Sequence, residues 1–178
     1  MSLLEEVSSL LRRRGTVHAV IGAAALAAHG VSRATADLDL LIVDDSCLDD
    51  RVWSSLGDTS HVDVRRGDFE DPLAGVIRIA RAREGSVDVI VGRSFWQRQL
   101  LARAETSSIG TTSLPVVRAA DLILLKLYAG GPQDIWDIVR LLEVDPGVVE
   151  EVEAHLSELP DECAGLWQRA LAGRSGSS

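Results

Sequence analysis

The stretch DLDLLIVDD, residues 37–45, alternates as a β-strand does and begins with two acidic residues. Successive side chains of a strand point to opposite faces, so Asp37 and Asp39 share a face while the leucine between them points away. Residues 40–43 are wholly apolar, which is typical of a strand inside a sheet. Two carboxylates at the mouth of a buried strand are well placed to hold Mg²⁺, a hard cation that prefers oxygen ligands. The alternative is an edge strand with a solvated acidic face.

The composition is that of a globular protein with reduced cysteines. The chain has 178 residues, of which 46% are hydrophobic, and a mean hydropathy of +0.12. No apolar run reaches the ~18 residues that a membrane span needs. Cys47 and Cys163 lie far apart and belong to no metal-binding spacing. We therefore expect a cytoplasmic protein without membrane contact, built as one domain or as a compact core with a helical appendage.

The charge narrows the class of binding partner. A net charge of −9 and a sequence pI near 4.9 argue against non-specific binding to duplex DNA, which needs a basic surface. A local basic pocket for phosphates or for one end of an RNA remains compatible with this charge. An acidic surface would also suit a cationic small molecule.

Hydrophobic periodicity places strands in the first two thirds of the chain and helices in the last third. This order indicates an α+β fold, in which a small sheet is followed by a helical C-terminal portion. We expect a core over 1–117, a helical portion over 118–172 and a disordered tail over 173–178. The expected elements are helices at 2–14, 22–29, 48–56 and 94–105, strands at 17–21, 37–43, 61–66, 75–83, 86–91 and near 114–117, and four helices between 118 and about 172.

Gly22 stands between the first expected strand and the helix that follows it. A glycine there lets a ligand approach the backbone, and the unpaired N–H groups at the start of a helix suit phosphate. A plain strand-to-helix turn would use the same residue, so this signal is weak alone.

A third carboxylate interrupts another apolar strand. Asp88 lies within SVDVIVG, residues 86–92, which is typical of a central strand, where a charge is rarely tolerated without a partner. Three carboxylates on adjacent strands would form a two-metal site able to clamp the attacking and leaving oxygens in phosphoryl transfer. An exposed position on a half-solvated strand is the alternative for Asp88, and Asp63 in HVDVRRG is a weaker candidate for the third ligand.

Lys126 is the only lysine among the 18 lysines and arginines of the chain. Its ammonium group, in the apolar helix DLILLKLYAG, is a compact point charge suited to phosphate. If it contacts only a nucleotide, Lys126→Ala should leave the fold stable. A snorkelling lysine at a helix edge is the alternative. Asp134 and Asp137 share a face of the next helix and could orient Lys126, although Asp134 also suits the helix N-terminus.

Two groups of arginines accompany these acids. Arg33 lies with Thr35 in GVSRATAD, the loop before the acidic strand, where it could neutralise the acids or contact phosphates. Arg78, Arg81 and Arg83 in IRIARAR form the only dense basic patch near the expected site. They are candidates for binding a polyanionic co-substrate, and a solvated strand face is the default interpretation.

Together these segments resemble the signatures of a known superfamily. VIGAAALAAHGVSRATADLDLLIV, residues 20–43, resembles the nucleotidyltransferase fold that includes DNA polymerase β: a glycine-led turn, a helix ending in His-Gly, Arg-x-Thr, then Asp-x-Asp. DLILLKLYAGGPQDIWDIVRLL, residues 121–142, is similar to a second signature of small bacterial members, a helical lysine followed by Asp-x-x-Asp. These members include abortive-infection (AbiEii-type) toxins and stand-alone domains. The resemblance covers roughly residues 17–143 and implies a small mixed sheet flanked by helices.

The resemblance also implies roles for individual residues. Gly22 would anchor the triphosphate, and Lys126 would contact the nucleotide. The three carboxylates Asp37, Asp39 and Asp88 would bind Mg²⁺, with Mn²⁺ as a substitute, and Asp88 would also be the general base. Many members have Gly-Gly or Gly-Ser where this chain has Gly22-Ala23, a change that removes one phosphate contact.

These observations predict a nucleotidyltransferase that moves a nucleoside monophosphate from an NTP to a hydroxyl acceptor. The acceptor could be an RNA 3′ end, a protein or a small molecule such as a cationic antibiotic, and a cognate antitoxin would accompany a toxin role. A catalytically silent nucleotide-binding or protein-interaction module of the same fold is the first alternative. A glycosyltransferase that uses Asp-x-Asp is the second, although such enzymes ordinarily need a larger nucleotide-binding domain.

Overall fold

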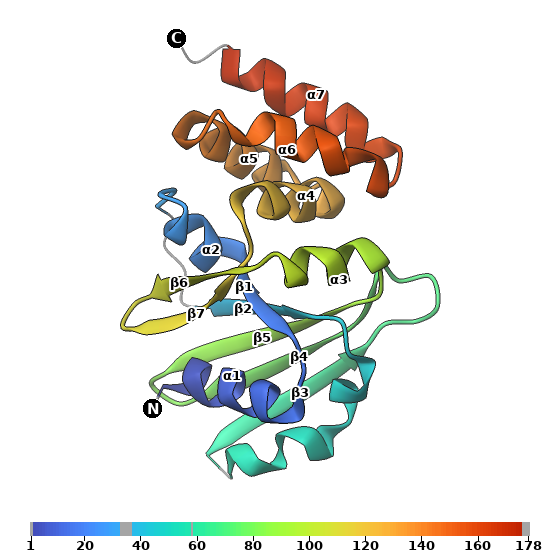
Figure 1. Cartoon of the computed structure of the whole chain (residues 1–178). Helices are drawn as coiled ribbons and strands as arrows, with labels where there is room; N and C mark the ends of the chain where they lie inside the picture. The colour runs from blue at the N-terminus through green and yellow to red at the C-terminus, as the bar shows by residue number, and fades with distance from the viewer. Residues whose placement is uncertain (1, 33–36, 58, 176–178) are drawn as a thin grey trace.

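The structure, a computed structural model, describes residues 2–32, 37–57 and 59–175. These residues form one mixed sheet of seven strands in the order β3-β4-β5-β2-β1-β7-β6 (Figure 1). β2 runs parallel to β5 and β1 parallel to β7, and the other neighbours are antiparallel. The strands are β1 (His18–Ile21), β2 (Asp37–Ile42), β3 (Ser60–Arg66), β4 (Leu73–Arg81), β5 (Gly85–Gly92), β6 (Glu105–Ile109) and β7 (Thr112–Val116).

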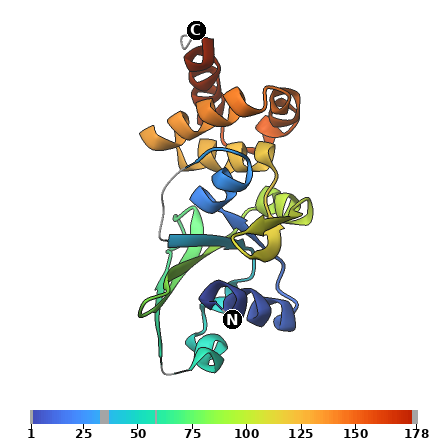
Figure 2. The same cartoon turned by 90° about the vertical axis from the view of Figure 1, so that its left-hand side faces the viewer.

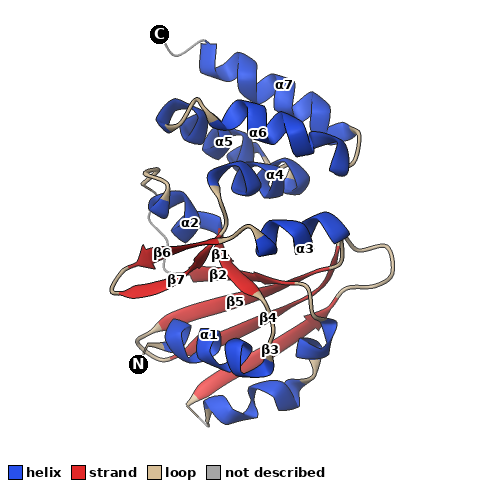
Figure 3. Cartoon of the chain, in the orientation of Figure 1, coloured by secondary structure: helices blue, strands red, loops and turns tan. Residues whose placement is uncertain are grey.

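The helices cover the sheet unevenly. Figure 2 shows α1 on one side of β3, β4 and β5 and no described helix against their other face. The C-terminal helices stack beyond α2 and α3, away from the outer strands (Figure 3). The helices are α1 (Leu3–Arg14), α2 (Gly22–Ala28), α3 (Phe95–Ala102), α4 (Ala119–Ala129), α5 (Pro132–Val144), α6 (Val148–His155) and α7 (Glu162–Ser175), with 3-10 helices η1 (Asp45–Leu48), η2 (Asp50–Leu56) and η3 (Leu156–Glu158).

The uneven cover follows from the alternation of side chains along the strands. In β4, Ile77 and Ile79 are fully buried, whereas Arg78 between them is exposed. In β5, Val87 and Val89 are buried, whereas Asp88 is only partly so. One face of these strands therefore packs into the core and the other carries charged side chains.

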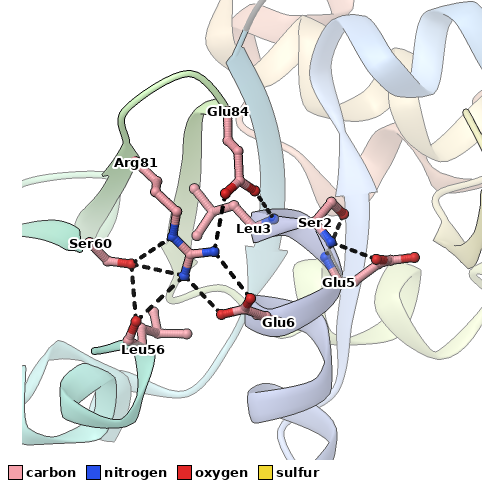
Figure 4. A network of polar contacts seen from close by, with 8 residues as sticks. All are labelled: Ser2, Leu3, Glu5, Glu6, Leu56, Ser60, Arg81 and Glu84. Atoms are coloured by element: carbon pink, nitrogen blue, oxygen red, sulfur yellow. Dashed lines mark hydrogen bonds and ion pairs between the residues drawn. The ribbon is translucent and has the colours of Figure 1, made fainter. Parts of the chain in front are cut away.

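α1 is fixed to the sheet by a network around Arg81, at the end of β4 (Figure 4). The Arg81 guanidinium donates to both carboxylate oxygens of Glu6 on α1, at 3.1 and 2.8 Å, and to the hydroxyl of Ser60. It also pairs with Glu84, whose carboxylate accepts a hydrogen bond from the Leu3 backbone N–H at the start of α1. This arrangement assigns Arg81 a structural role.

Most expected elements are present, including four α-helices among the described residues after 118, and three regions differ. Residues 48–56 were expected to form one helix but form parts of two 3-10 helices, because Asp44 and Asp49 accept backbone N–H groups two residues on and so favour short turns. The helix expected over 94–105 ends at Ala102, and β6 then pairs with β7 through a hairpin in which Gly110 has a φ of 60°.

At the C-terminus, α7 continues to Ser175, so it includes the first residues of the segment expected to form a tail. Residues 176–178 lie outside the described part of the chain. Among the described helices, none combines the length and apolar character needed to cross a membrane.

Candidate active site

The sheet register brings the three sequence-predicted carboxylates together. Asp39 on β2 is the direct neighbour of Asp88 on β5, and Asp37 is the direct neighbour of Ser86. Neighbouring strands lie about 4.8 Å apart, and residues two apart share a face, so these side chains form one cluster. The Ser86 hydroxyl donates a 2.6 Å hydrogen bond to Oδ1 of Asp37. Ser-x-Asp on β5 thus faces Asp-x-Asp on β2.

The cluster is crowded with negative charge, and its pKa values reflect this. Burial first, and then the charges of Asp88 and Asp37, raise the pKa of Asp39 to about 6. Burial raises the pKa of Asp88. The hydrogen bond from Ser86 lowers the pKa of Asp37, with Arg78 contributing. Such divergent pKa values within one group of carboxylates are common at functional sites.

Arg78 provides the nearest positive charge. It is the direct neighbour of Asp88 on the other side, on β4. Its guanidinium lies 3.3 Å from Oδ2 of Asp37 and 3.6 Å from Oδ2 of Asp88, and it donates to the hydroxyl of Ser86 at 3.0 Å. The other Asp88 oxygen, Oδ1, is buried and has no hydrogen-bond partner among the described residues. An unpaired buried carboxylate oxygen is costly unless another ligand satisfies it.

Gly22 lies directly against Asp39. It begins α2 with a φ of 64°, and a Cβ atom built on it would stand 2.1 Å from Oδ2 of Asp39. The backbone at the start of α2, with Ala23 in its first turn, is therefore next to the carboxylate cluster.

We expect Gly22→Ala to destabilise the protein by more than a positive φ alone requires. The left-handed conformation costs a non-glycine residue roughly 1–2 kcal/mol, and the added methyl group must also displace Asp39. Gly110→Ala is the matched control, because Gly110 has a φ of 60° and open space around its Cβ position. Chemical denaturation should give a larger loss for Gly22→Ala, and equal losses would contradict close packing of Gly22 on Asp39.

Lys126 is buried in an ion-paired cluster between α4 and α5. Its ammonium donates to Asp137 at 2.6 Å and to Asp134 at 3.0 Å. The Lys126 side chain is 8% exposed and that of Asp137 is fully buried, so Lys126 does not snorkel at a helix edge. The expected orientation of this lysine by the two aspartates is thus present. Its charge also reaches the carboxylate cluster, because it opposes the rise in the pKa of Asp39.

The other predicted basic residues are dispersed. Arg81 points into the network that holds α1, because residues three apart on a strand lie on opposite faces, and Arg83 lies in the turn between β4 and β5 with a φ of 71°. Of the expected patch, Arg78 is the member that contacts the carboxylates. Arg33 and Thr35 lie outside the described residues.

The contacts of two polar residues near the cluster were not predicted from the sequence. Asp63, the weaker candidate for a third ligand, is the neighbour of Arg78 on β3 and pairs with the exposed Arg65 instead. Ser86 was missed, although its i, i+2 spacing to Asp88 matches that of the Asp-x-Asp pair.

The three carboxylates are of the kind that binds a hard divalent cation, but in this structure they are not grouped closely enough to hold one. Carboxylate oxygens are the ligands that Mg²⁺ prefers, and the partnerless oxygen of Asp88 is one available donor. Within residues 2–32, 37–57 and 59–175, however, no three Asp, Glu, His or Cys side chains are grouped closely enough to hold a metal ion. Arg78 lies between two of the carboxylates, so a metal would have to replace its guanidinium.

The fold is that of the nucleotidyltransferases. It is similar to an antigenic nucleotidyltransferase-like protein from Paracoccidioides brasiliensis, with a TM-score of 0.60 and 17% identity over 98% of this chain and 88% of that one. It is also similar to ANT(2'')-Ia in complex with adenylyl-2''-tobramycin, with a TM-score of 0.56 and 16% identity over 94% of this chain and 96% of that one.

The chain itself belongs to the family described as nucleotidyl transferases of unknown function (DUF2204), whose model matches residues 1–169. No curated protein matches the chain. The predicted mixed sheet flanked by helices and the nucleotidyltransferase resemblance are confirmed by these findings.

Proposed function

We propose that this protein is a metal-dependent nucleotidyltransferase that moves a nucleoside monophosphate from an NTP to a hydroxyl acceptor. The observation that carries the proposal is the carboxylate cluster itself. Asp39 and Asp88 are direct neighbours on parallel strands, and the Gly22 backbone lies against Asp39. Membership of a nucleotidyl transferase family gives this cluster its chemical context.

Asp37, Asp39 and Asp88 are the residues that would hold Mg²⁺, or Mn²⁺ in its place. When bound, the metal ions would neutralise the phosphates and the developing charge of the transfer. The raised pKa of Asp39 supports this assignment, because a carboxylate surrounded by like charges gains most from a nearby cation.

In the proposed reaction the oxygen of an acceptor hydroxyl attacks the α-phosphorus of the NTP. A new O–P bond forms, the bond between the α-phosphorus and the β-phosphate oxygen breaks, and pyrophosphate leaves. The hydroxyl proton passes to the Asp88 carboxylate, whose pKa burial raises toward that of a competent base. The rest of the catalysis is positioning and charge stabilisation.

The nucleotide would lie on the Gly22 side of the cluster, next to Ala23 in the first turn of α2. Arg33 and Thr35, which precede Asp37 in the sequence, are proposed to contact it. Lys126 contributes differently from the expected direct phosphate contact. Because its ammonium is bound by Asp134 and Asp137, we propose that it positions α4 and α5 beside the site and adds positive potential near Asp39.

The proposed acceptor is an RNA end, a protein hydroxyl or a small molecule. A toxin role with a cognate antitoxin is supported by the sequence resemblance alone. ANT(2'')-Ia was solved with an adenylylated antibiotic, which makes tobramycin a useful test acceptor. The silent-module alternative is favoured by Gly22-Ala23 and by the guanidinium among the carboxylates, and opposed by the complete set of three acids.

Incubation with each α-³²P-labelled NTP and Mg²⁺ separates these functions. Cell RNA, cell protein and tobramycin are supplied in turn as acceptors, with EDTA as the control. The proposal predicts covalent label on one acceptor class together with an equal amount of pyrophosphate. Binding of NTP with no release of pyrophosphate from it, whichever acceptor is supplied, would instead identify a silent nucleotide-binding module.

We expect Mg²⁺ and NTP together to raise the melting temperature of the protein by about 5–10 °C. A ligand at 100 times its Kd stabilises the native state by about 2.7 kcal/mol, and each kcal/mol corresponds to roughly 2–4 °C for a domain of this size. Differential scanning fluorimetry measures the shift, and either ligand alone should produce less. No shift with both at millimolar concentration would argue against a nucleotide site.

A further inference from the structure

On the charged face of the outer strands, polar side chains extend from the carboxylate cluster in a single row across the sheet. The register places Asp39, Asp88, Arg78 and Asp63 side by side across β2, β5, β4 and β3. No described helix covers this face of β3, β4 and β5, as Figure 2 shows. Gly22, which follows β1, lies at the opposite end of the row from β4 and β3. A nucleotide held at Gly22 therefore leaves the Arg78 side of Asp88 open to a second substrate.

Arg78 reaches the carboxylates from a half-exposed position. Its side chain is 48% exposed, that of Asp37 is 51% exposed and that of Asp88 is 18% exposed, and both ion-pair distances exceed 3.2 Å. The exposed pair with Asp37 contributes little to stability, whereas the pair with the mostly buried Asp88 holds the guanidinium until another cation binds that carboxylate. A cation bound by Asp37 and Asp88 would repel it and take over its partners.

Space for the displaced guanidinium lies immediately beside Asp88. A cavity of about 150 Å³ is lined by Asp63, Arg65, Val76, Arg78 and Asp88. The Asp63 and Arg65 charges balance each other at 3.0 Å. Once Asp88 is neutralised, the remaining unbalanced charge of this cavity is the positive one of Arg78.

We infer that this cavity, which we call the Arg78 pocket, receives the acceptor, and that the acceptor is the hydroxyl end of a nucleotide chain whose phosphate is bound by Arg78. The inference rests on the proposed function and specifies its second substrate. Its basis is the place of Arg78 next to the proposed general base, on the side away from Gly22. A guanidinium binds a phosphate group with two parallel hydrogen bonds, and a cationic acceptor such as an aminoglycoside would be repelled there.

Arg78→Gln tests the inference, with Arg51→Gln as the matched control. Arg51, on η2, is 92% exposed and pairs with Asp49, so its loss changes the net charge equally without touching the Arg78 pocket. The acceptors are a short oligoribonucleotide with a free 3′ hydroxyl, the corresponding nucleoside, and tobramycin. Two quantities are measured: the KM of each acceptor with saturating NTP, and the Kd of Mg²⁺ by calorimetry without any acceptor.

We expect Arg78→Gln to raise the KM of the oligoribonucleotide about 10- to 100-fold, as loss of a charge-assisted hydrogen bond does. The KM of the nucleoside should change by less than 2-fold, and Mg²⁺ should bind the variant at least as tightly as the wild type. An unchanged oligoribonucleotide KM, preferred transfer to tobramycin, or weaker Mg²⁺ binding by the variant would each overturn the inference. If the wild-type protein transfers label from NTP to none of the three acceptors, the proposed function is wrong and the inference is wrong with it.

Discussion

Lys126→Ala should lower the free energy of unfolding by about 3–5 kcal/mol, because it removes the ammonium that the buried Asp137 carboxylate and Asp134 share. Asp137 is fully buried and lies 2.6 Å from the Lys126 ammonium. This revises the sequence-based expectation that Lys126→Ala would leave the fold stable. Urea denaturation at pH 7.5 measures the loss.

Two further variants make the test of Lys126 specific. Lys126→Met combined with Asp137→Leu should cost less than Lys126→Ala alone, because it removes both members of the buried ion pair and leaves only the partly exposed Asp134 without the ammonium. Arg140→Ala is the control, since it breaks an exposed pair with Glu143 on the same helix α5 and should cost less than about 1 kcal/mol. If Lys126→Ala also costs less than about 1 kcal/mol, the Lys126 ion pairs do not contribute to stability as a buried cluster should.

Asp39→Asn should stabilise the protein in the absence of metal, by about 1–3 kcal/mol at pH 7.5. The pKa of Asp39 is raised from 3.8 to about 6 in the folded protein, so the folded state binds this proton more tightly than the unfolded chain does. Ionisation of Asp39 therefore destabilises the native state progressively as the pH rises from about 4 to 6. Asparagine carries no charge and escapes this penalty.

The pH dependence distinguishes this effect from a general change in packing. The advantage of Asp39→Asn over the wild type should grow between pH 4 and pH 7 and then level off. Asp63→Asn is the control on the same face of the sheet, where the partner is the exposed Arg65, and it should change stability by less than about 1 kcal/mol. A variant less stable than wild type across this range would contradict the charge crowding at Asp39.

The part of the fold that follows from periodicity could be predicted from the sequence. The alternation in β4 and the apolar run after Asp39 identify strands, because burial on one or both faces determines these patterns. The 3-10 helices at 45–56 could not be recognised, since local side-chain hydrogen bonds from aspartates, and not the apolar pattern, determine their geometry. β6 was missed because its polar sequence ETSSI gains strand structure by pairing with β7.

The candidate site shows the same division. Asp37, Asp39 and Asp88 could be proposed from their position in apolar strands, since a charge there needs a partner. The contacts of Arg78 depend on the register between β4 and β5, which local sequence does not encode. The burial of Lys126 depends likewise on how α5 packs against α4.

The proposed reaction is tested most directly by label transfer from an α-³²P-labelled NTP, measured side by side for wild-type protein and Asp39→Asn. With Mg²⁺ and an acceptor mixture of cell RNA, cell protein and tobramycin, the wild type should label an acceptor and release pyrophosphate. The transfer rate of Asp39→Asn should be at least about 100-fold lower, which is the usual effect of removing one group that stabilises transition-state charge. Its melting curve should show an intact fold. Transfer by Asp39→Asn at the wild-type rate would contradict the assignment of the carboxylate cluster as the active site.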